Sequence, residues 1–247
     1  MLQNQESRKV PSVTFKTRVD NQWLDRTSEQ IFKGRTVVVF GLPGAYTPTC
    51  SSSHVPRFNE LADAFKENGV SEIVCISVND AFVMAEWQKD QKADRITFLP
   101  DGNGEFTSKL GMLVDKSDLG FGKRSWRYSM LVRDGVVEKM FIEADVKGDP
   151  FEVSDADTML HYVNPKATEP RFAFLFTKLG CPHCARAKTL LKAQGIAYEE
   201  AVIGRDISSR AIRAASNHST VPQVFMNGRL VGGADDLEKF LSTNAAA

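Results

Sequence analysis

The cysteine with the most reactive sequence context is Cys50, at the end of the segment Pro43–Cys50. The apolar run Val37–Phe40 before it is typical of a buried strand, and a helix is predicted from about His54 to Lys66 after it. Cys50 is therefore expected in the first turn of a helix, on a loop that leaves a strand. Unpaired backbone N–H groups and the helix dipole favour the thiolate there, which is the nucleophilic form of cysteine.

A second pair of thiols, Cys181 and Cys184, has C-x-x-C spacing and opens a helix predicted to run to about Gln194. This spacing occurs in redox-active dithiols and in zinc sites. Zinc needs four ligands, and the sequence contains no second C-x-x-C and no close pair of histidines. We therefore interpret the pair as redox-active and expect no metal; a metal-binding or iron–sulfur module is the alternative.

The composition is that of an ordinary globular protein: 42% of its 247 residues are hydrophobic, 25% are charged, and the formal net charge is zero. A neutral chain has no general attraction for nucleic acid or an anionic membrane, so neither is expected as a partner. No apolar run approaches the ~20 residues of a membrane span, and residues 1–9 lack the apolar core of a secretory signal. We predict a cytoplasmic protein whose four cysteines do not form a disulfide scaffold.

Strands and helices alternate along the first two thirds of the chain, which predicts an α/β layer fold. Polar residues 20–33 are expected to include a helix. Strands are expected over 10–19, 36–42, 71–79 and 97–99, and as a hairpin of 126–132 with 136–142 across Asp134-Gly135. Further helices are expected over 81–89, 105–110 and 155–162.

Two prolines in the polar stretch 164–170 predict a semi-rigid linker between a domain of residues 1–163 and one of residues 171–247. The second domain has the predicted order β-α-β-α-β-β-α with C-x-x-C at the start of its first helix, which is thioredoxin-like. Its elements are expected over 172–177, 181–194, 197–202, 207–216, 223–226, 229–231 and 235–241.

The motif Pro43-x-x-x-Thr47-x-x-Cys50, followed by Arg127, resembles the peroxiredoxins, and in particular the peroxiredoxin-5 group, over about residues 5–162. The resemblance implies a thioredoxin-like fold and a Cys50 thiolate that attacks a peroxide oxygen to become a sulfenic acid. Arg127 would hold the thiolate and polarise the peroxide. The Thr47 hydroxyl would donate to one peroxide oxygen and accept from the other, and Pro43 would shield the site.

Four other features of the first domain bear on this chemistry. We interpret Cys75, which lies in the middle of a predicted strand, as a core residue. His54 could contact the site, but we interpret it as a solvated histidine on the helix surface. Because no other cysteine of the first domain is placed as a resolving partner, we expect a one-cysteine mechanism in which an outside thiol reduces the sulfenic acid. Three aromatic residues either line a pocket for organic hydroperoxides or belong to the core or an interface: Phe121, Trp126 and Tyr128.

The second domain resembles the glutaredoxins over residues 170–247. The resemblance implies that Cys181 is the nucleophile and that Cys184 is a buried thiol, dispensable for removing glutathione from a mixed disulfide. Lys178 would help to bind the glycine carboxylate of glutathione, and His183 stands where glutaredoxins usually have tyrosine. The remaining glutathione contacts are expected from two loops: Thr220, Val221 and Pro222, and Gly233, Ala234 and Asp235.

Together the two sites resemble those of hybrid peroxiredoxin–glutaredoxin proteins. We therefore predict a glutathione-dependent peroxidase for hydrogen peroxide and alkyl hydroperoxides, in which Cys50 is glutathionylated and Cys181 then removes the glutathione. The resemblance also implies a homo-oligomer, a dimer or tetramer. A peroxide sensor, redox switch or holdase is the alternative, and the turnover number distinguishes a switch from an enzyme.

Overall fold

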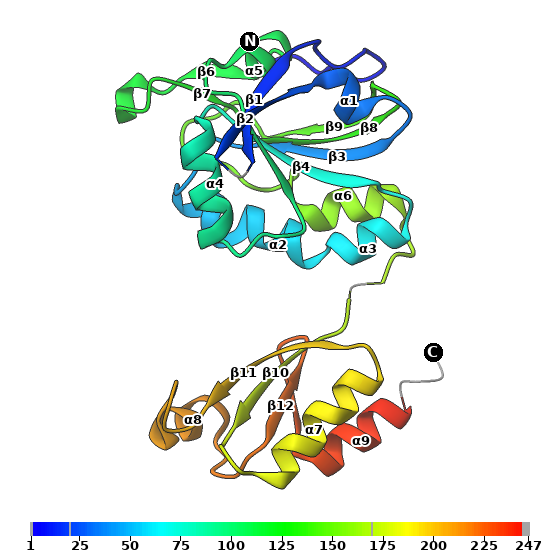
Figure 1. The fold of residues 1–247 in the computed structure, drawn as a ribbon, viewed down its shortest axis with the longest axis vertical. Coiled ribbons are helices and arrows are strands. Elements are labelled where there is room, and N and C mark those ends of the chain that lie inside the picture. The colour runs from blue at the N-terminus through cyan, green and yellow to red at the C-terminus, as the bar shows by residue number, and fades with distance from the viewer. Residues whose placement is uncertain (1, 20, 169, 244–247) are drawn as a thin grey trace. The chain divides into compact units, whose positions relative to one another are not determined.

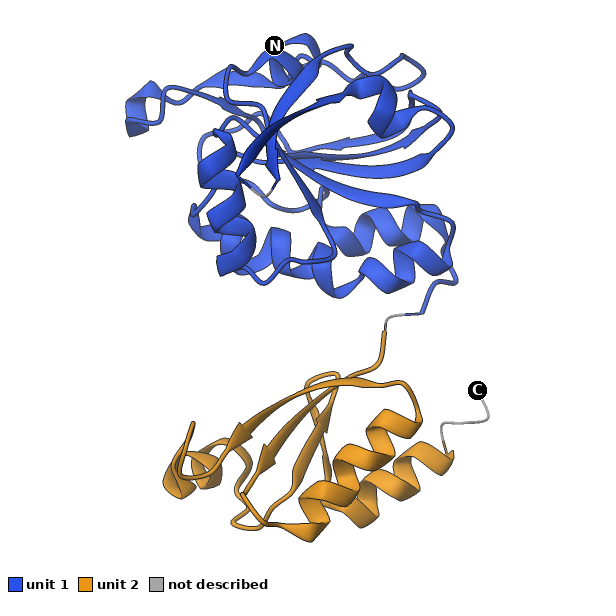
Figure 2. Ribbon diagram, in the orientation of Figure 1, with its two compact units in different colours: residues 1–169 blue, residues 170–247 orange. Residues whose placement is uncertain are grey.

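The computed structural model describes residues 2–19, 21–168 and 170–243. The chain divides into two compact units, residues 1–169 and 170–247 (Figure 2). Asp20, in the predicted helical region, and Glu169, in the predicted linker, lie outside the described residues. Within the described ranges, every helix is too short or too polar to cross a membrane.

Unit 1 is built on a mixed five-stranded sheet (Figure 1). The three strands at one edge are parallel because helices connect them, and the last two form an antiparallel hairpin. In spatial order they are β5 (Thr97–Pro100), β4 (Glu72–Ser77), β3 (Thr36–Gly41), β8 (Tyr128–Arg133) and β9 (Val136–Ile142).

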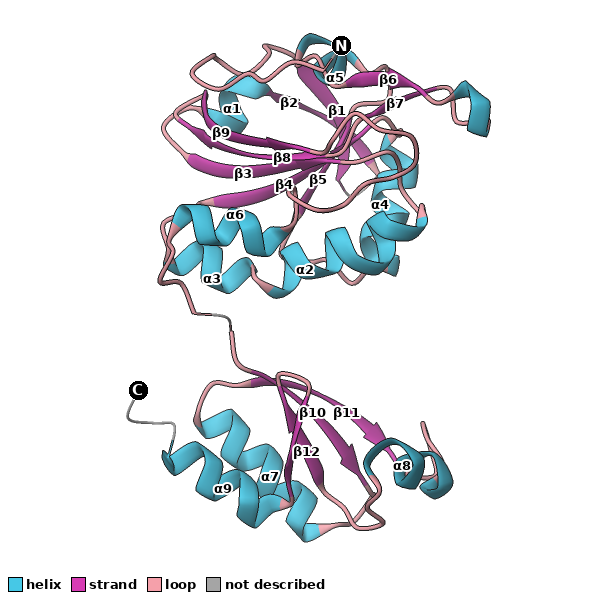
Figure 3. Cartoon of the chain, turned by 180° about the vertical axis from the view of Figure 1, so that it is seen from behind, coloured by secondary structure: helices cyan, strands magenta, loops and turns pink. Residues whose placement is uncertain are grey.

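Both faces of this sheet are covered, which is why the central strand β3 is buried and without polar side chains from Val37 to its end. Val38 and Phe40 belong to one buried cluster, and the alternate residues Val37 and Val39 belong to the other. Four helices contribute to the first cluster: α2 (Val55–Glu60), α3 (Ala62–Glu67), α4 (Ala81–Asp90) and α6 (Ala156–Val163). On the second face lie β1 (Thr14–Val19), α1 (Ser28–Phe32), α5 (Glu105–Lys109), and the small hairpin of β6 (Leu113–Asp115) and β7 (Lys123–Ser125) (Figure 3).

The largest difference from the sequence prediction lies in the region expected to contain a helix. Residues Gln22–Thr27 form β2, which pairs with β1 along its whole length, so only the short α1 is helical. Thr27 caps that helix, accepting from the Gln30 backbone N–H at 3.2 Å while Gln30 Oε1 accepts from the Thr27 N–H at 2.8 Å. The β6–β7 hairpin and the short 3₁₀ turn η2 (Ser117–Leu119) were also not predicted.

Unit 2 has a four-stranded sheet of order β11 (Ala197–Val202), β10 (Phe172–Thr177), β12 (Gln223–Met226) and β13 (Arg229–Gly232). Strands β10 and β11 are parallel, and β12 and β13 are antiparallel. Helices α7 (Pro182–Ala193) and α9 (Ala234–Thr243) pack on the sheet through one apolar cluster, and α8 (Ser209–Ser216) completes the unit. Each unit therefore joins a parallel β-α-β segment to an antiparallel hairpin, which confirms the prediction of two thioredoxin-like α/β domains.

Candidate active site

Cys50 lies in the first turn of a helical segment that follows the loop after β3, and it is fully buried. The segment does not continue as one α-helix. It begins with the π-helical turn η1 (Cys50–His54), in which the Val55 N–H donates to the Cys50 carbonyl. Pro56 has no N–H and cannot make the α-helical bond to the residue four positions earlier, which explains the wider turn. The predicted helix over 54–66 is further divided into α2 and α3 at Leu61.

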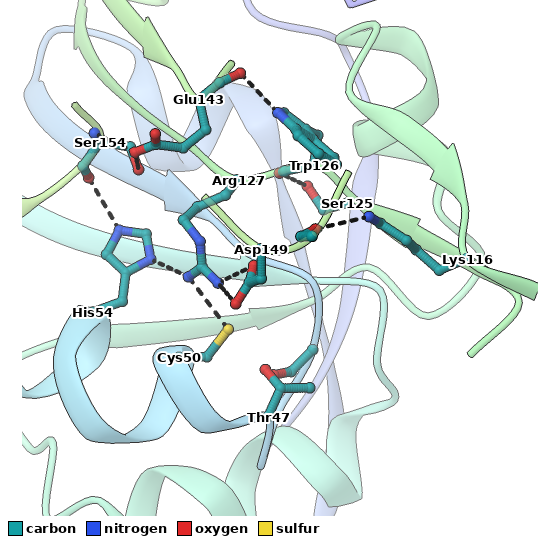
Figure 4. Close-up of polar contacts among 12 residues, drawn as sticks. Thr47, Cys50, His54, Lys116, Ser125, Trp126, Arg127, Glu143, Asp149 and Ser154 are labelled. Carbon is teal, nitrogen blue, oxygen red and sulfur yellow. Dashed lines mark hydrogen bonds and ion pairs between the residues drawn. The ribbon is translucent and has the colours of Figure 1, made fainter. Parts of the chain in front are cut away.

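The Arg127 side chain reaches Cys50 from the start of the β8–β9 hairpin (Figure 4). Its Nη1 donates to the Cys50 sulfur at 3.4 Å, and Nη2 donates to both carboxylate oxygens of Asp149, at 2.5 and 2.6 Å. The Arg127 side chain is 1% exposed and that of Asp149 is 41% exposed. A guanidinium at this distance from the sulfur favours a negative charge on it.

His54 is a functional candidate that the sequence analysis misjudged, because its side chain is fully buried rather than solvated. Its Nδ1 lies 3.2 Å from Arg127 Nη1, and its Nε2 lies 3.1 Å from the Ser154 carbonyl oxygen. Burial lowers the pKa of His54 to about 3, with a further contribution from the charge of Arg127. His54 is therefore a neutral imidazole at physiological pH. The i,i+4 spacing from Cys50 was the signal that could have identified it.

The loop that carries Asp149 and Ser154 is held by the buried carboxylate of Glu143. Glu143 Oε1 accepts from the backbone N–H groups of Glu152, Val153 and Ser154 at 2.8–2.9 Å, and from the Ser154 hydroxyl at 2.7 Å. Burial acts to raise the pKa of Glu143, but these hydrogen bonds outweigh it and lower the pKa. Nothing in the sequence distinguished this carboxylate.

Phe151, on the same loop, packs against both the His54 ring and the Arg127 guanidinium. Its ring lies 4.9 Å from the His54 ring and 5.4 Å from the Arg127 guanidinium carbon. Contact with an aromatic face favours a cation and displaces water from it.

Thr47 and Pro43 lie on the loop between β3 and Cys50, and Pro43 is buried. The Thr47 hydroxyl donates to the Gly44 carbonyl at 2.8 Å. Because a hydroxyl has one proton, Thr47 can accept a hydrogen bond from a substrate in this conformation but cannot donate one. The loop is held by the segment that follows β4, where Asn79 Oδ1 accepts from the Ala45 N–H at 3.0 Å.

The other singled-out residues of unit 1 lie in the core. Cys75 is fully buried on β4, and burial raises its pKa well above the ordinary value for a thiol. Trp126 and Tyr128 are buried in the second cluster, on the sheet face opposite that of Cys50, so they do not line its site. Phe121 is partly exposed near Arg124, whose guanidinium carbon lies 6.0 Å from its ring.

In unit 2, Cys181 is the N-cap of α7 and is partly exposed, and Cys184 is buried. The Cys181 sulfur accepts from the Cys184 backbone N–H at 3.2 Å and donates to the Val221 carbonyl at 3.9 Å. Burial, together with the hydrogen bond to Cys181, raises the pKa of Cys184 to about 11. The two thiols therefore differ: one is accessible, and the other stays protonated at neutral pH.

The structure brings one of the two expected glutathione loops to Cys181 directly, through Val221, whose peptide bond to Pro222 is cis. Gln223 holds that loop by donating to the Thr220 carbonyl at 3.0 Å. Lys178 is exposed, and its carbonyl accepts from the Cys181 N–H at 3.3 Å.

The other expected loop begins α9, and two of its polar groups already have partners within the protein. The Gly233 N–H donates to Asp236 Oδ2 at 2.9 Å, and Asp235 pairs with Arg186 of α7. Ala234 is buried beside them. Across the part of the chain that the structure describes, no three acidic, histidine or cysteine side chains are grouped to hold a metal.

Comparisons with known proteins agree with this two-site architecture. The chain matches the Redoxin family over residues 5–160 and the Glutaredoxin family over residues 173–231. It is 57% identical to the hybrid peroxiredoxin hyPrx5 of Haemophilus influenzae over 98% of this chain and 100% of that protein. It is 56% identical to a peroxiredoxin of Synechocystis over 68% of this chain and 97% of that protein.

Two solved structures are similar to part of the chain. Reduced Prx3 of Vibrio vulnificus in complex with H2O2 shares 38% identity with a TM-score of 0.62, covering 65% of this chain and 99% of that one. The antioxidant protein of Plasmodium falciparum, a 1-Cys peroxiredoxin, shares 32% identity with a TM-score of 0.63, covering 66% of this chain and 100% of that one. The chain therefore belongs to the peroxiredoxins, as a hybrid with a C-terminal glutaredoxin domain, and is a peroxidase.

Proposed function

We propose that the protein is a glutathione-dependent thiol peroxidase for hydrogen peroxide and alkyl hydroperoxides, and that its two units act in one cycle. The Cys50 thiolate attacks a peroxide oxygen and forms an S–O bond as the O–O bond breaks. The leaving alkoxide or hydroxide takes up the proton that the Cys50 thiol released on ionising and departs as an alcohol or water, and Cys50 is left as a sulfenic acid. Glutathione then condenses with the Cys50 sulfenic acid, releasing water and leaving a mixed disulfide. Cys181 takes the glutathionyl group from Cys50, and a second glutathione releases it as glutathione disulfide. In total, two glutathiones reduce one peroxide.

The observation that carries this proposal is the hydrogen bond from Arg127 Nη1 to the buried Cys50 sulfur. A fixed cation beside the sulfur can stabilise both the thiolate and the charge that develops as the O–O bond breaks. The Arg127 Nε is buried and has no hydrogen-bond partner among the described residues, so one donor of the guanidinium is left unused within the protein. Thr47 supplies an acceptor for the peroxide proton, and Pro43 keeps the loop closed.

The proposed role of unit 2 depends on the difference between its thiols. Cys181 is accessible at the start of a 12-residue helix, and Cys184 is buried and protonated, so Cys181 is the attacking group. We propose that glutathione lies along Thr220, Val221 and Pro222, with its glycine carboxylate at Lys178. Its γ-glutamyl end would lie at the start of α9, at Gly233, Ala234 and Asp235. Because Asp235 is paired with Arg186, binding at that end requires the ion pair to open or to share its charge.

The test is peroxide consumption with glutathione, glutathione reductase and NADPH as the only other components. The wild-type protein should turn over many times per minute, the Cys50→Ser protein should have no activity, and Cys181→Ser should form one sulfenic acid per chain without glutathione-driven turnover. Full activity of Cys50→Ser would refute the assignment of the peroxidatic thiol. A single slow oxidation of the wild-type protein would instead indicate a redox switch.

The cycle also bears on location and assembly. It consumes reduced glutathione and needs free thiols, and all four cysteines are unpaired in the structure, which supports a cytoplasmic location.

For assembly, unit 1 exposes an apolar surface where Trp23 of β2 meets Phe82 of α4, with ring centroids 5.9 Å apart. These side chains are 61% and 55% exposed. We propose that a second copy of the chain covers them, so Phe82→Asp should reduce the mass measured by light scattering.

A further inference from the structure

Cys50 and His54 share one nitrogen of the Arg127 guanidinium. Arg127 Nη1 lies 3.4 Å from the Cys50 sulfur and 3.2 Å from His54 Nδ1 (Figure 4). This nitrogen carries two hydrogens, so one can point to the sulfur and the other to the imidazole. The sulfur and the ring are therefore joined through a single donor group.

The Ser154 carbonyl determines which tautomer of His54 is present. A carbonyl oxygen only accepts hydrogen bonds, so the Nε2 atom of His54, 3.1 Å away, must carry the proton. In a neutral ring this leaves a lone pair on Nδ1, directed at Arg127. The Glu143 carboxylate in turn fixes Ser154 by accepting a hydrogen bond from the Ser154 backbone N–H at 2.8 Å. The acceptor facing Arg127 is thus set by a chain of hydrogen bonds that leads back to Glu143.

The surroundings keep this imidazole neutral and in place. Its ring packs against three aromatic rings, with centroids 4.8, 5.5 and 4.9 Å away, those of Phe40, Phe58 and Phe151. Two charged or titratable groups face it, the Arg127 guanidinium and, beyond the shared nitrogen, the Cys50 sulfur; Asp149 lies on the opposite amino group of Arg127. Burial and the Arg127 charge together hold the pKa of His54 at about 3.

We propose that His54 is a positioning residue for the peroxidase reaction: it binds one hydrogen of Arg127 Nη1 so that the other is aimed at the Cys50 sulfur. This inference depends on the proposed role of Cys50. A neutral acceptor orients the guanidinium without competing with the thiolate for its charge, which a carboxylate at the same place would do. An apolar residue there would leave a buried N–H without a partner, and the guanidinium could then turn toward Asp149.

The experiment compares two reactions of Cys50 in the full-length protein. The first is oxidation by hydrogen peroxide, which needs an oriented Arg127, and the second is alkylation by iodoacetamide, which needs only the thiolate. Both rate constants are taken from the plateau that they reach at high pH, where Cys50 is ionised with or without help from Arg127, so that they compare orientation alone. The variants are His54→Leu, which removes the acceptor, and His54→Asn, whose amide oxygen can replace Nδ1. His161→Leu is the matched control, because His161 is exposed on α6 and lies outside the site.

We expect His54→Leu to slow peroxide oxidation by roughly 10- to 100-fold, the scale of losing an oriented catalytic group, with alkylation changed by less than about threefold. His54→Asn should react with peroxide at least about tenfold faster than His54→Leu, and His161→Leu should react like the wild type. If His54→Leu does not give the wild-type thermal unfolding curve, His54→Phe, which fills more of the aromatic cage, takes its place.

Three outcomes would overturn the inference: wild-type peroxide rates in a folded variant without the acceptor, equal slowing of both reactions, or no recovery with His54→Asn. Equal slowing would show a structural effect on the whole helix rather than on Arg127. Failure of the underlying function is distinguishable, since it would appear as an unreactive wild-type protein or an active Cys50→Ser protein.

Discussion

Arg127 donates from Nη2 to both carboxylate oxygens of Asp149, although the arginine is buried and the aspartate lies at the surface. Burial acts to lower the pKa of Arg127, but the negative charges of Cys50 and Asp149 outweigh it and raise the pKa above its ordinary value. The guanidinium therefore remains a cation although its side chain is buried. Asp149 fixes one end of it, and the thiol and His54 occupy the other.

Replacing Asp149 with asparagine should slow the reaction of Cys50 with hydrogen peroxide. An amide offers one acceptor oxygen instead of two and no charge, so Nη2 is held less firmly and Arg127 spends less time oriented toward the sulfur. We expect a loss of about tenfold in the second-order rate constant, or ~1.4 kcal/mol, measured by stopped flow. Asp145→Asn, an exposed change on the same loop, is the control. An unchanged rate in Asp149→Asn would show that the ion pair does not orient Arg127.

Glu143→Gln should destabilise unit 1, and the effect should depend on pH. The pKa of Glu143 is lowered in the folded state, so its carboxylate stabilises the fold above the ordinary value of 4.5, and this contribution is lost as the pH falls through the lower folded value. We expect glutamine to cost about 1–2 kcal/mol at neutral pH, because an uncharged acceptor replaces a buried carboxylate bound by three N–H groups, and less as the pH falls toward about 3.

Urea unfolding followed by tryptophan fluorescence measures this loss in unit 1 alone, since all three tryptophans, Trp23, Trp87 and Trp126, lie in it. Glu152→Gln is the matched control, because the Glu152 side chain is exposed and only its backbone N–H contacts Glu143. A stability difference between Glu143→Gln and wild type that is constant from neutral to acidic pH would contradict the assigned role of the carboxylate.

The sequence was sufficient to place Cys50 and Arg127 relative to the strands of the predicted sheet. Cys50 and Arg127 are 77 positions apart, but Cys50 follows β3 after one loop and Arg127 directly precedes β8, so the sheet that pairs β3 with β8 brings them together. His54 was misjudged because a histidine one turn beyond Cys50 and beside the polar Ser51–Ser53 has the sequence context of an exposed helix residue, whereas the structure buries it. In the fold it is buried by Phe40, by Phe58, and by Phe151 on the loop from β9 to α6, whose Ser154 carbonyl also contacts its Nε2.

That loop could not be predicted from the sequence. Its functional groups, Asp149, Phe151 and the Ser154 carbonyl, have no periodic pattern, and their positions depend on the contact between Glu143 and three backbone N–H groups. A buried carboxylate of this kind looks like any surface glutamate in a sequence. For the same reason β2 was missed, because its residues are mostly exposed and only its pairing with β1 defines it.

Cys184→Ser should retain most of the glutathione-driven peroxidase activity. Burial raises the pKa of Cys184 to about 11, so at neutral pH it is a thiol and cannot be the attacking group. We expect a change of less than about threefold in turnover for Cys184→Ser and a loss of activity for Cys181→Ser in the glutathione reductase coupled assay. An inactive Cys184→Ser protein that remains folded would mean that an intramolecular disulfide between the two cysteines is an obligatory step.

An equimolar mixture of Cys50→Ser and Cys181→Ser proteins should regain peroxidase activity that rises with protein concentration. In the wild type, the tethered unit 2 meets Cys50 at an effective concentration that can reach the millimolar range, so its specific activity should not depend on dilution. In the mixture, an intact Cys181 must find a glutathionylated Cys50 on another chain, so specific activity should fall on dilution below micromolar concentrations.

The measurement is the coupled assay over a hundredfold range of protein concentration. If the mixture stays inactive throughout, Cys181 serves only the Cys50 of its own chain; recovery without any dependence on dilution would show transfer inside a stable mixed oligomer.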